Sequence, residues 1–195
     1  RLKMTEWGPA MNLPVSDVLK LILTAPAPPV VAGALPSDRL APLFSALQSA
    51  KPPRPPEEIE DDIWALWTAH DDPALEARMQ RAISAIARRR FSEAETLLDA
   101  LVREAPDWAE AWNKRATLYY LTRRDAESLE DIRRTLALEP RHFGAICGFA
   151  QICLRCGEKA AAASAFNAAL QINPHLDSVR AILAELEPAP PPRLN

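Results

Sequence analysis

The chain has 195 residues, a net charge of -3 and 48% hydrophobic residues, which is enough for a sizeable folded core. The small net charge argues against strong electrostatic attraction to nucleic acid or to a membrane surface. Only 5 residues are Gly, and Ala, Leu, Glu and Arg dominate from residue 57 onward, which favours helices over a sheet.

Residues 1–36 are expected to be a flexible leader or a signal segment. Arg1 and Lys3 precede an apolar stretch, and residues 32–34 have the small-x-small form of a signal-peptidase site. Charges and prolines interrupt the apolar stretch, so the alternative is a loose leader with one short amphipathic helix. With a signal, the protein is periplasmic or exported; otherwise it is cytoplasmic. No stretch reaches the roughly eighteen apolar residues of a membrane span, so no transmembrane helix is predicted.

Two helices are predicted between residues 37 and 73, joined by the polyproline-like linker KPPRPP. Residues 37–50 place apolar side chains on one face. Residues 57–70 begin with acidic side chains, which suit the positive end of a helix dipole. Because Trp64 and Trp67 lie in this second helix, it must be packed rather than solvated. We expect residues 37–73 to form an N-terminal helical cap.

A period of 34 residues organises the rest of the chain. Pro106, Pro140 and Pro174 each follow an apolar helix end, and each interval holds two helical patterns separated by a turn. Residues 109–140 are the clearest unit: two amphipathic patterns meet at a turn, and Pro140 ends the second. Neither pattern can bury its apolar face alone, so the unit needs neighbouring repeats.

Marker side chains recur at the same places in each unit. The large side chains of the middle unit include Trp112 and Tyr119. Small residues stand where paired helices must approach each other, at Ala82, Ala116, Ala150, Ala94, Ser128 and Ala162. With these markers, the chain resembles a bacterial member of the tetratricopeptide repeat family over about residues 74–187. Two departures stand in the first unit, where Arg78 replaces the preferred Trp and Leu101 the preferred Ala.

The resemblance implies an all-α solenoid of three antiparallel helix pairs with helical caps at both ends. The C-terminal cap is the amphipathic segment after Pro174, and residues 188–195 are a proline-rich tail. The turn between the helices of a pair carries Gly157 in the last unit, where a positive φ is inexpensive. Arg89 and Arg123 stand at the same place in the first two units, so those turns are expected to be less standard.

The resemblance also implies a non-catalytic scaffold that binds a peptide or helix of a partner protein in a concave groove lined by the first helices. By position, the groove residues are Met79, Ile83, Ile86, Glu110, Asn113, Thr117, Tyr120, Cys147, Gln151 and Leu154. The alternative is a self-associating structural protein whose groove is occupied by its own N-terminal segment. The clamp that binds chaperone C-termini in one subtype of the family is excluded, because several charge-assisted donors would have to converge and they are missing.

No other group of residues in the sequence makes a convincing catalytic or metal-binding site. Cys147, Cys153 and Cys156 lie on one predicted helix, where Cys153 falls on the buried stripe and the three thiols do not converge. A redox or metal protein using them is the third hypothesis, and core packing the preferred interpretation. The arginines at the turns could meet an acidic partner, but nearby carboxylates favour a solvated edge. We predict no catalytic residue, no cofactor, no metal and no nucleic-acid partner.

Overall fold

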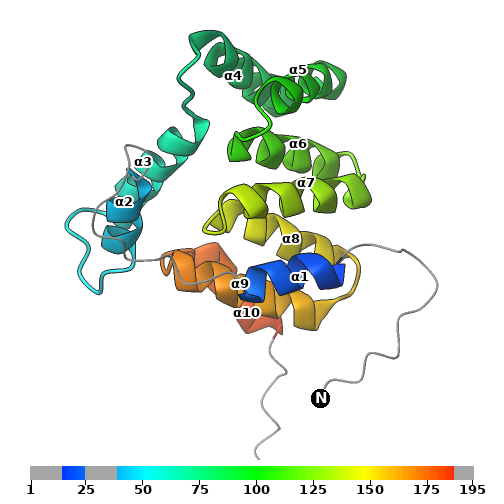
Figure 1. Cartoon of the computed structure of the whole chain (residues 1–195). Helices are drawn as coiled ribbons and strands as arrows, with labels where there is room; N and C mark the ends of the chain where they lie inside the picture. Colours follow the sequence, from blue (N-terminus) through cyan, green and yellow to red (C-terminus); the bar gives the residue numbers. More distant parts are fainter. Residues whose placement is uncertain (1–14, 25–38, 187–195) are drawn as a thin grey trace, which may run out of the picture.

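The computed structural model describes residues 15–24 and 39–186, and every regular element in these ranges is an α-helix, as predicted (Figure 1). The rest of the leader and the tail at 188–195 lie outside the described residues. The helices are α1 (Val15–Thr24), α2 (Leu40–Leu47), α3 (Pro56–Thr68), α4 (Pro73–Ala87), α5 (Phe91–Glu104), α6 (Ala109–Leu121), α7 (Asp125–Leu138), α8 (Phe143–Arg155), α9 (Lys159–Ile172) and α10 (Asp177–Leu186).

Helices α4 to α9 form three pairs stacked as a solenoid (Figure 1). The pairs are α4 with α5, α6 with α7 and α8 with α9, and the first helices also contact their successors, α4 with α6 and α6 with α8. We call α4, α6 and α8 the inner helices and their partners the outer helices. The solenoid begins at Asp72, whose carboxylate accepts a hydrogen bond of 2.8 Å from the backbone N–H of Ala74, and α10 packs against α9 at its other end.

Small side chains at the helix crossings explain the close packing of each pair. All six predicted positions are buried, with Ala116 the most exposed at 3%. Ser128 uses its hydroxyl as well, donating a hydrogen bond of 2.8 Å to the carbonyl of Ala116 across the pair. A larger side chain at these crossings would push the helices apart.

Arg115 of α6 ties the first two repeats together. It donates two hydrogen bonds of 2.8 and 2.9 Å to Asp131 of α7, and one of 2.9 Å to Asp99 of α5. Burial raises the pKa of Asp131, and the Arg115 guanidinium opposes this rise. A bidentate, partly buried pair of this kind fixes orientation more firmly than an exposed ion pair does.

The three turns within the helix pairs share one geometry, although only one contains glycine. Arg89, Arg123 and Gly157 have φ values of 57°, 65° and 82°. In each turn the next residue donates a backbone hydrogen bond to a carbonyl five residues earlier, at 2.8, 2.9 and 2.8 Å. The two arginine turns therefore adopt the standard form, at the cost of a left-handed backbone at a residue with a Cβ.

We expect Arg89→Gly and Arg123→Gly each to raise the free energy of unfolding by about 0.5–1 kcal/mol, because glycine adopts a positive φ without strain. The opposite change, Gly157→Ala, should lower it by about 1 kcal/mol, although nothing lies within 4 Å of the added Cβ. Urea denaturation of the three variants measures these changes. Destabilisation by both glycine substitutions would show that the arginine side chains stabilise the turns through contacts.

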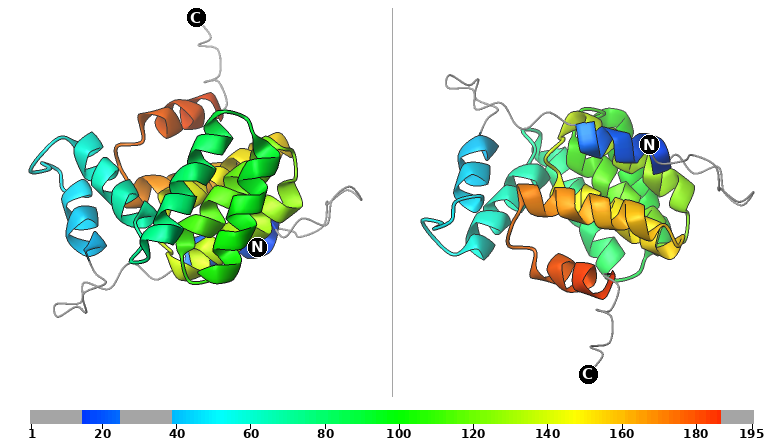
Figure 2. Two further views of the ribbon diagram at one scale, coloured as in Figure 1. Left: turned by 90° about the horizontal axis from the view of Figure 1, so that it is seen from above. Right: turned by 90° about the horizontal axis from the view of Figure 1, so that it is seen from below.

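The N-terminal helices run back along the solenoid instead of extending it. Helix α1 contacts α7, α8 and α9 on the outer side, opposite α10 (Figure 2). Helices α2 and α3 form a hairpin beside the N-terminal ends of α6 and α8 (Figure 1). We expected residues 37–73 to cap the first repeat. Helices α2 and α3 instead lie beside the second and third repeats, because their apolar faces join the core of those repeats.

Candidate functional site

The inner helices hold the ten residues predicted to line a groove, but these residues differ in accessibility. Met79, Glu110 and Asn113 are buried, with exposures of 0%, 0% and 6%. They are not available to a partner in this structure. Thr117 is exposed, and the other six are half-buried: Ile83, Ile86, Tyr120, Cys147, Gln151 and Leu154.

Helix α3 covers the N-terminal part of the inner face, and its contact with α8 depends on a glycine. A Cβ added at Gly144 would lie 2.5 Å from Cη2 of Trp64. The same indole packs edge-on against Phe143, with ring centroids 5.6 Å apart, and the ammonium of Lys114 lies 5.1 Å from its ring centroid. Glycine at this position allows the indole to lie directly against the helix backbone.

Trp67, one helical turn further along α3, stacks on the ring of His142 with centroids 4.0 Å apart and an interplanar angle of 8°. The carbonyl of Trp67 accepts a hydrogen bond of 2.8 Å from Nε1 of Trp108, which precedes α6. Apolar packing and a directional bond thus fix the C-terminal half of α3 to two inner helices.

The other end of the α2–α3 hairpin is fixed to the C-terminal end of α9 and to the loop that follows it. Asn173 donates a hydrogen bond of 2.9 Å to Glu60 of α3, and Gln48 donates one of 3.1 Å to the carbonyl of Gln171. His175 Nε2 lies 3.0 Å from the carbonyl of Leu47. The hairpin is therefore attached both at the start of the second repeat and at the end of the third repeat.

A buried polar network lies beneath Trp67. His142 accepts a hydrogen bond of 3.1 Å at Nδ1 from the backbone N–H of Ala145, so Nε2 carries the ring proton and donates it to Glu110 over 2.8 Å. Asn113 donates to the same Glu110 oxygen over 2.9 Å, and Lys114 Nζ forms an ion pair of 2.8 Å with the other. Burial alone would raise the pKa of Glu110, but His142 and Lys114 together hold it below its ordinary value.

The C-terminal part of the inner face remains accessible. We call it the open inner surface, and it consists of Ile83, Ile86, Thr117, Tyr120, Gln151 and Leu154. None of these side chains is charged. Leu121, which borders the surface, is 46% exposed and is one of two large hydrophobic residues exposed in the described part of the chain.

Arg155 holds Tyr120 in place at the edge of the open inner surface. Its guanidinium lies 4.0 Å from the centroid of the Tyr120 ring and donates a hydrogen bond of 3.2 Å to the carbonyl of Tyr120. The same guanidinium forms an ion pair with Asp125. Tyr120 is thus a fixed aromatic platform rather than a freely rotating side chain.

The cysteines have the properties of core residues. Cys153 is fully buried, and burial raises the pKa of both Cys153 and Cys147 to about 12. Thiols with such pKa values are poor nucleophiles and poor metal ligands at neutral pH. Within residues 15–24 and 39–186, no three His, Cys, Asp or Glu side chains come together as a metal site.

Other surface features offer less to a ligand. Two of the turn arginines are paired with glutamates: Arg90 with Glu93 at 3.1 Å, and Arg124 with both Glu95 and Glu127. A cavity of about 520 Å³ lies beside the hairpin, lined by residues that include Leu66, His70 and Trp108. No described helix has the length and apolar character required to cross a membrane.

The residues that divide the inner face were not predicted from the sequence. Trp64, Trp67 and His142 belong to no predicted groove position. A usable signal was present, since two tryptophans in an otherwise acidic helix must be buried against something. Gly144 was a second signal, because a glycine inside a helix costs stability unless another group needs the space.

Comparisons with known proteins support the repeat assignment. A family model described as tetratricopeptide repeat matches residues 79–142, from α4 to the start of the third repeat. A TPR repeat-containing protein of Rhizobium etli is 35% identical over 143 residues, which make up 73% of this chain and 70% of that protein.

Proposed function

Because the chain belongs to the tetratricopeptide repeat family, whose members generally mediate protein–protein interactions, we propose that it is a non-catalytic scaffold that binds a peptide or helix of a partner protein. The proposed binding site is the open inner surface. The observation that carries the proposal is the division of the inner face, because α3 covers the N-terminal ends of α6 and α8 and leaves their C-terminal parts accessible.

The composition of this surface supports a partner with apolar side chains. Isoleucines of α4, a fixed tyrosine of α6 and a leucine of α8 offer apolar area, while Thr117 and Gln151 offer hydrogen bonds. Aromatic side chains held rigid by their neighbours are typical anchors of binding energy. Since no charged group belongs to the surface, binding should depend little on salt concentration.

The alternative function places the N-terminal segment of the chain, residues 1–36, in the groove. The helix that lies on the inner face is instead α3, which belongs to the predicted cap. Trp64 and Trp67 fill the part of the inner face next to His142 and Gly144, as an intramolecular ligand would. This occupation does not extend to Thr117 or Leu154. We therefore favour a groove that is half filled by the chain itself and half available to a partner.

A matched pair of threonine variants tests the proposed site. Thr117 and Thr96 are both exposed, and each donates its hydroxyl hydrogen bond to the carbonyl four residues earlier in its helix. Thr117 lies on inner helix α6 and Thr96 on outer helix α5. We expect Thr117→Lys to weaken partner binding by about tenfold or more and Thr96→Lys to leave it unchanged, with both variants as stable as the wild type.

Peptides selected against the wild-type chain from a displayed library provide the ligands for this measurement. Their dissociation constants for the three proteins are then compared by fluorescence anisotropy. Equal loss of binding in both variants, or no loss in Thr117→Lys, would place the interface away from the open inner surface.

A further inference from the structure

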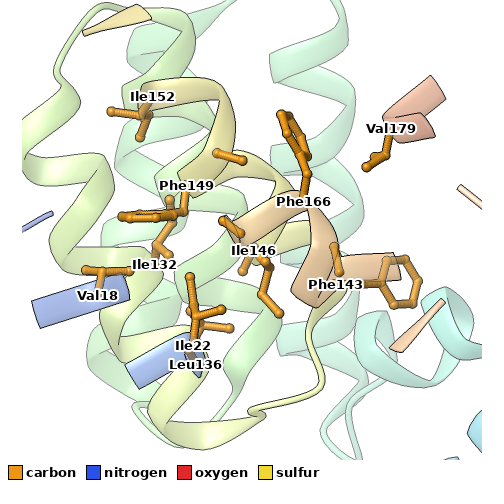
Figure 3. Packing of buried hydrophobic residues seen from close by; sticks show 14 of the residues in the cluster. Val18, Ile22, Ile132, Leu136, Phe143, Ile146, Phe149, Ile152, Phe166 and Val179 are labelled. Carbon is orange, nitrogen blue, oxygen red and sulfur yellow. The ribbon is translucent and has the colours of Figure 1, made fainter. Parts of the chain in front are cut away.

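Helix α1 lies on the outer side of the repeats, where it contacts α7, α8 and α9. Its buried side chains recur every three or four residues and have exposures of 2%, 0% and 8% at Val15, Val18 and Ile22. Figure 3 shows Val18 beside Ile132 and Phe149, and Ile22 beside Leu136. We call this surface of α7, α8 and α9, centred on Ile132, Leu136 and Phe149, the α1 seam.

The attachment of α1 to the seam is apolar. The ion pair between Lys20 and Asp17 and the hydrogen bond from Thr24 to the carbonyl of Lys20 both stay within α1. Asp17 also attracts Arg133 of α7 electrostatically, without pairing with it. Within the described ranges, no hydrogen bond or ion pair joins α1 to the repeats.

The α2–α3 hairpin is attached differently. Directional bonds from Trp108, Asn173 and Gln48 hold it to the repeats, and Trp64 lies against Gly144. Dissociation of the hairpin would break all of these contacts. Dissociation of α1 would break only apolar contacts and, among the described residues, no hydrogen bond to the repeats. Of the N-terminal helices, α1 is therefore the one that can dissociate from the repeats and bind again.

A helix of this length depends on its partner surface. Helices shorter than about 12–15 residues are marginal in water, and α1 has 10 residues. When it leaves the seam, it therefore exposes apolar side chains on both surfaces and tends to unfold. Any helix that restores the same contacts is favoured, and an identical α1 from another copy of the chain restores every one of them.

We propose that the α1 seam is a helix-binding surface separate from the inner face, and that α1 of a second copy can replace the α1 of the same chain. When each of two copies places its α1 in the α1 seam of the other, the two copies form a dimer. The surface favours an amphipathic helix with small β-branched side chains at the spacing of Val15, Val18 and Ile22. The inference does not rest on the proposed function of the inner face.

The first experiment uses a labelled synthetic peptide with the sequence of residues 15–24 and three full-length proteins. Val18→Asp places a charge in the seam and releases α1, whereas Leu23→Asp places the same charge on the exposed side of the helix, where Leu23 is 57% exposed. The peptide should bind Val18→Asp about tenfold or more tightly than it binds the wild type or Leu23→Asp, because the intramolecular helix no longer competes.

The second experiment starts with the wild-type chain, so its main result does not depend on the folding of a variant. Wild-type chains with natural and heavy isotopes are mixed at roughly millimolar concentration, and native mass spectrometry should detect dimers of mixed mass. Leu23→Asp should form them and Val18→Asp should not. The proposal is overturned by any one of three results: mixed dimers absent from the wild type, equal dimers in Val18→Asp, or no peptide binding to a Val18→Asp protein that keeps the wild-type unfolding transition.

Discussion

Glu110→Ala is expected to lower the free energy of unfolding by about 3 kcal/mol, one of the two largest effects we predict. Alanine would leave the Nε2–H of His142, which is fully buried, without an acceptor, and would remove the ion-pair partner of Lys114. Glu130→Ala is the control, since it breaks an exposed ion pair with Arg133 and should cost about 0.5 kcal/mol or less. Urea denaturation of both variants gives the comparison.

The pH dependence of stability tests the charge of Glu110 separately. Burial raises its pKa, but His142 and Lys114 more than compensate and hold it below the ordinary value of 4.5. A carboxylate whose pKa is lowered by folding stabilises the folded state above its unfolded pKa and loses this contribution as the pH falls through the folded pKa. In Glu110→Gln the amide oxygen still accepts from His142, but the charge is absent.

The stability difference between wild type and Glu110→Gln should therefore be constant from about pH 7 down to about pH 5 and shrink below that. Unfolding free energies measured across this range check the expectation. A difference that stays constant to about pH 3 would mean that folding does not lower the pKa of Glu110.

Gly144→Ala and Gly148→Ala should have opposite effects, although both replace a glycine of α8. Glycine to alanine in a helix normally stabilises by about 0.5–1 kcal/mol, and we expect this of Gly148→Ala, whose added Cβ would meet only Ile132 at 3.7 Å. At Gly144 the added Cβ would lie 2.5 Å from Trp64, so the indole must move. Overpacking of this kind costs about 1–3 kcal/mol, which makes Gly144→Ala a destabilising change.

Two measurements separate a shift of Trp64 from general loosening. Unfolding free energies of the two variants should differ by about 2 kcal/mol. Tryptophan fluorescence should change in Gly144→Ala and stay as in the wild type in Gly148→Ala. If Gly144→Ala is as stable as Gly148→Ala, α3 does not lie against α8 in the way described.

The fold could be predicted because its signals are local and repeated. Prolines at a period of 34 residues mark the repeat ends, and small residues such as Ala82 and Ala150 mark the helix crossings. Each of these features reflects contacts between helices of one repeat, which are close in the sequence, so it can be recognised without knowing how distant segments pack. The arginine turns were predicted to be less standard, yet φ values of 57° and 65° place Arg89 and Arg123 in the same conformation as Gly157.

The division of the inner face could not be predicted, because it depends on a contact between distant segments. The position of Glu110 within its helix says only that it points to the inner side. Whether it meets solvent or His142 depends on where α3 docks, and only the two tryptophans hint at that contact. Asn113 is buried with Glu110, to which it donates a hydrogen bond, although it occupies a groove position. Met79 is buried for a different reason, because it packs into the core between α4, α5 and α6. Thr117 is exposed and Tyr120 is half-buried, because α3 contacts α6 near its other end, where Trp108 donates to the carbonyl of Trp67.

In this structure α3 is a fixed part of the inner face, and the proposed partner site is the C-terminal part that α3 leaves uncovered. Hydrogen exchange of backbone amides in the wild-type chain tests this arrangement most directly. The amides of α3 should exchange within about tenfold of those of α8, because both open only with the repeats, while α1 should exchange about a hundredfold faster. Exchange of α3 at the rate of α1 would contradict this arrangement, since the hairpin would then leave the whole inner face open.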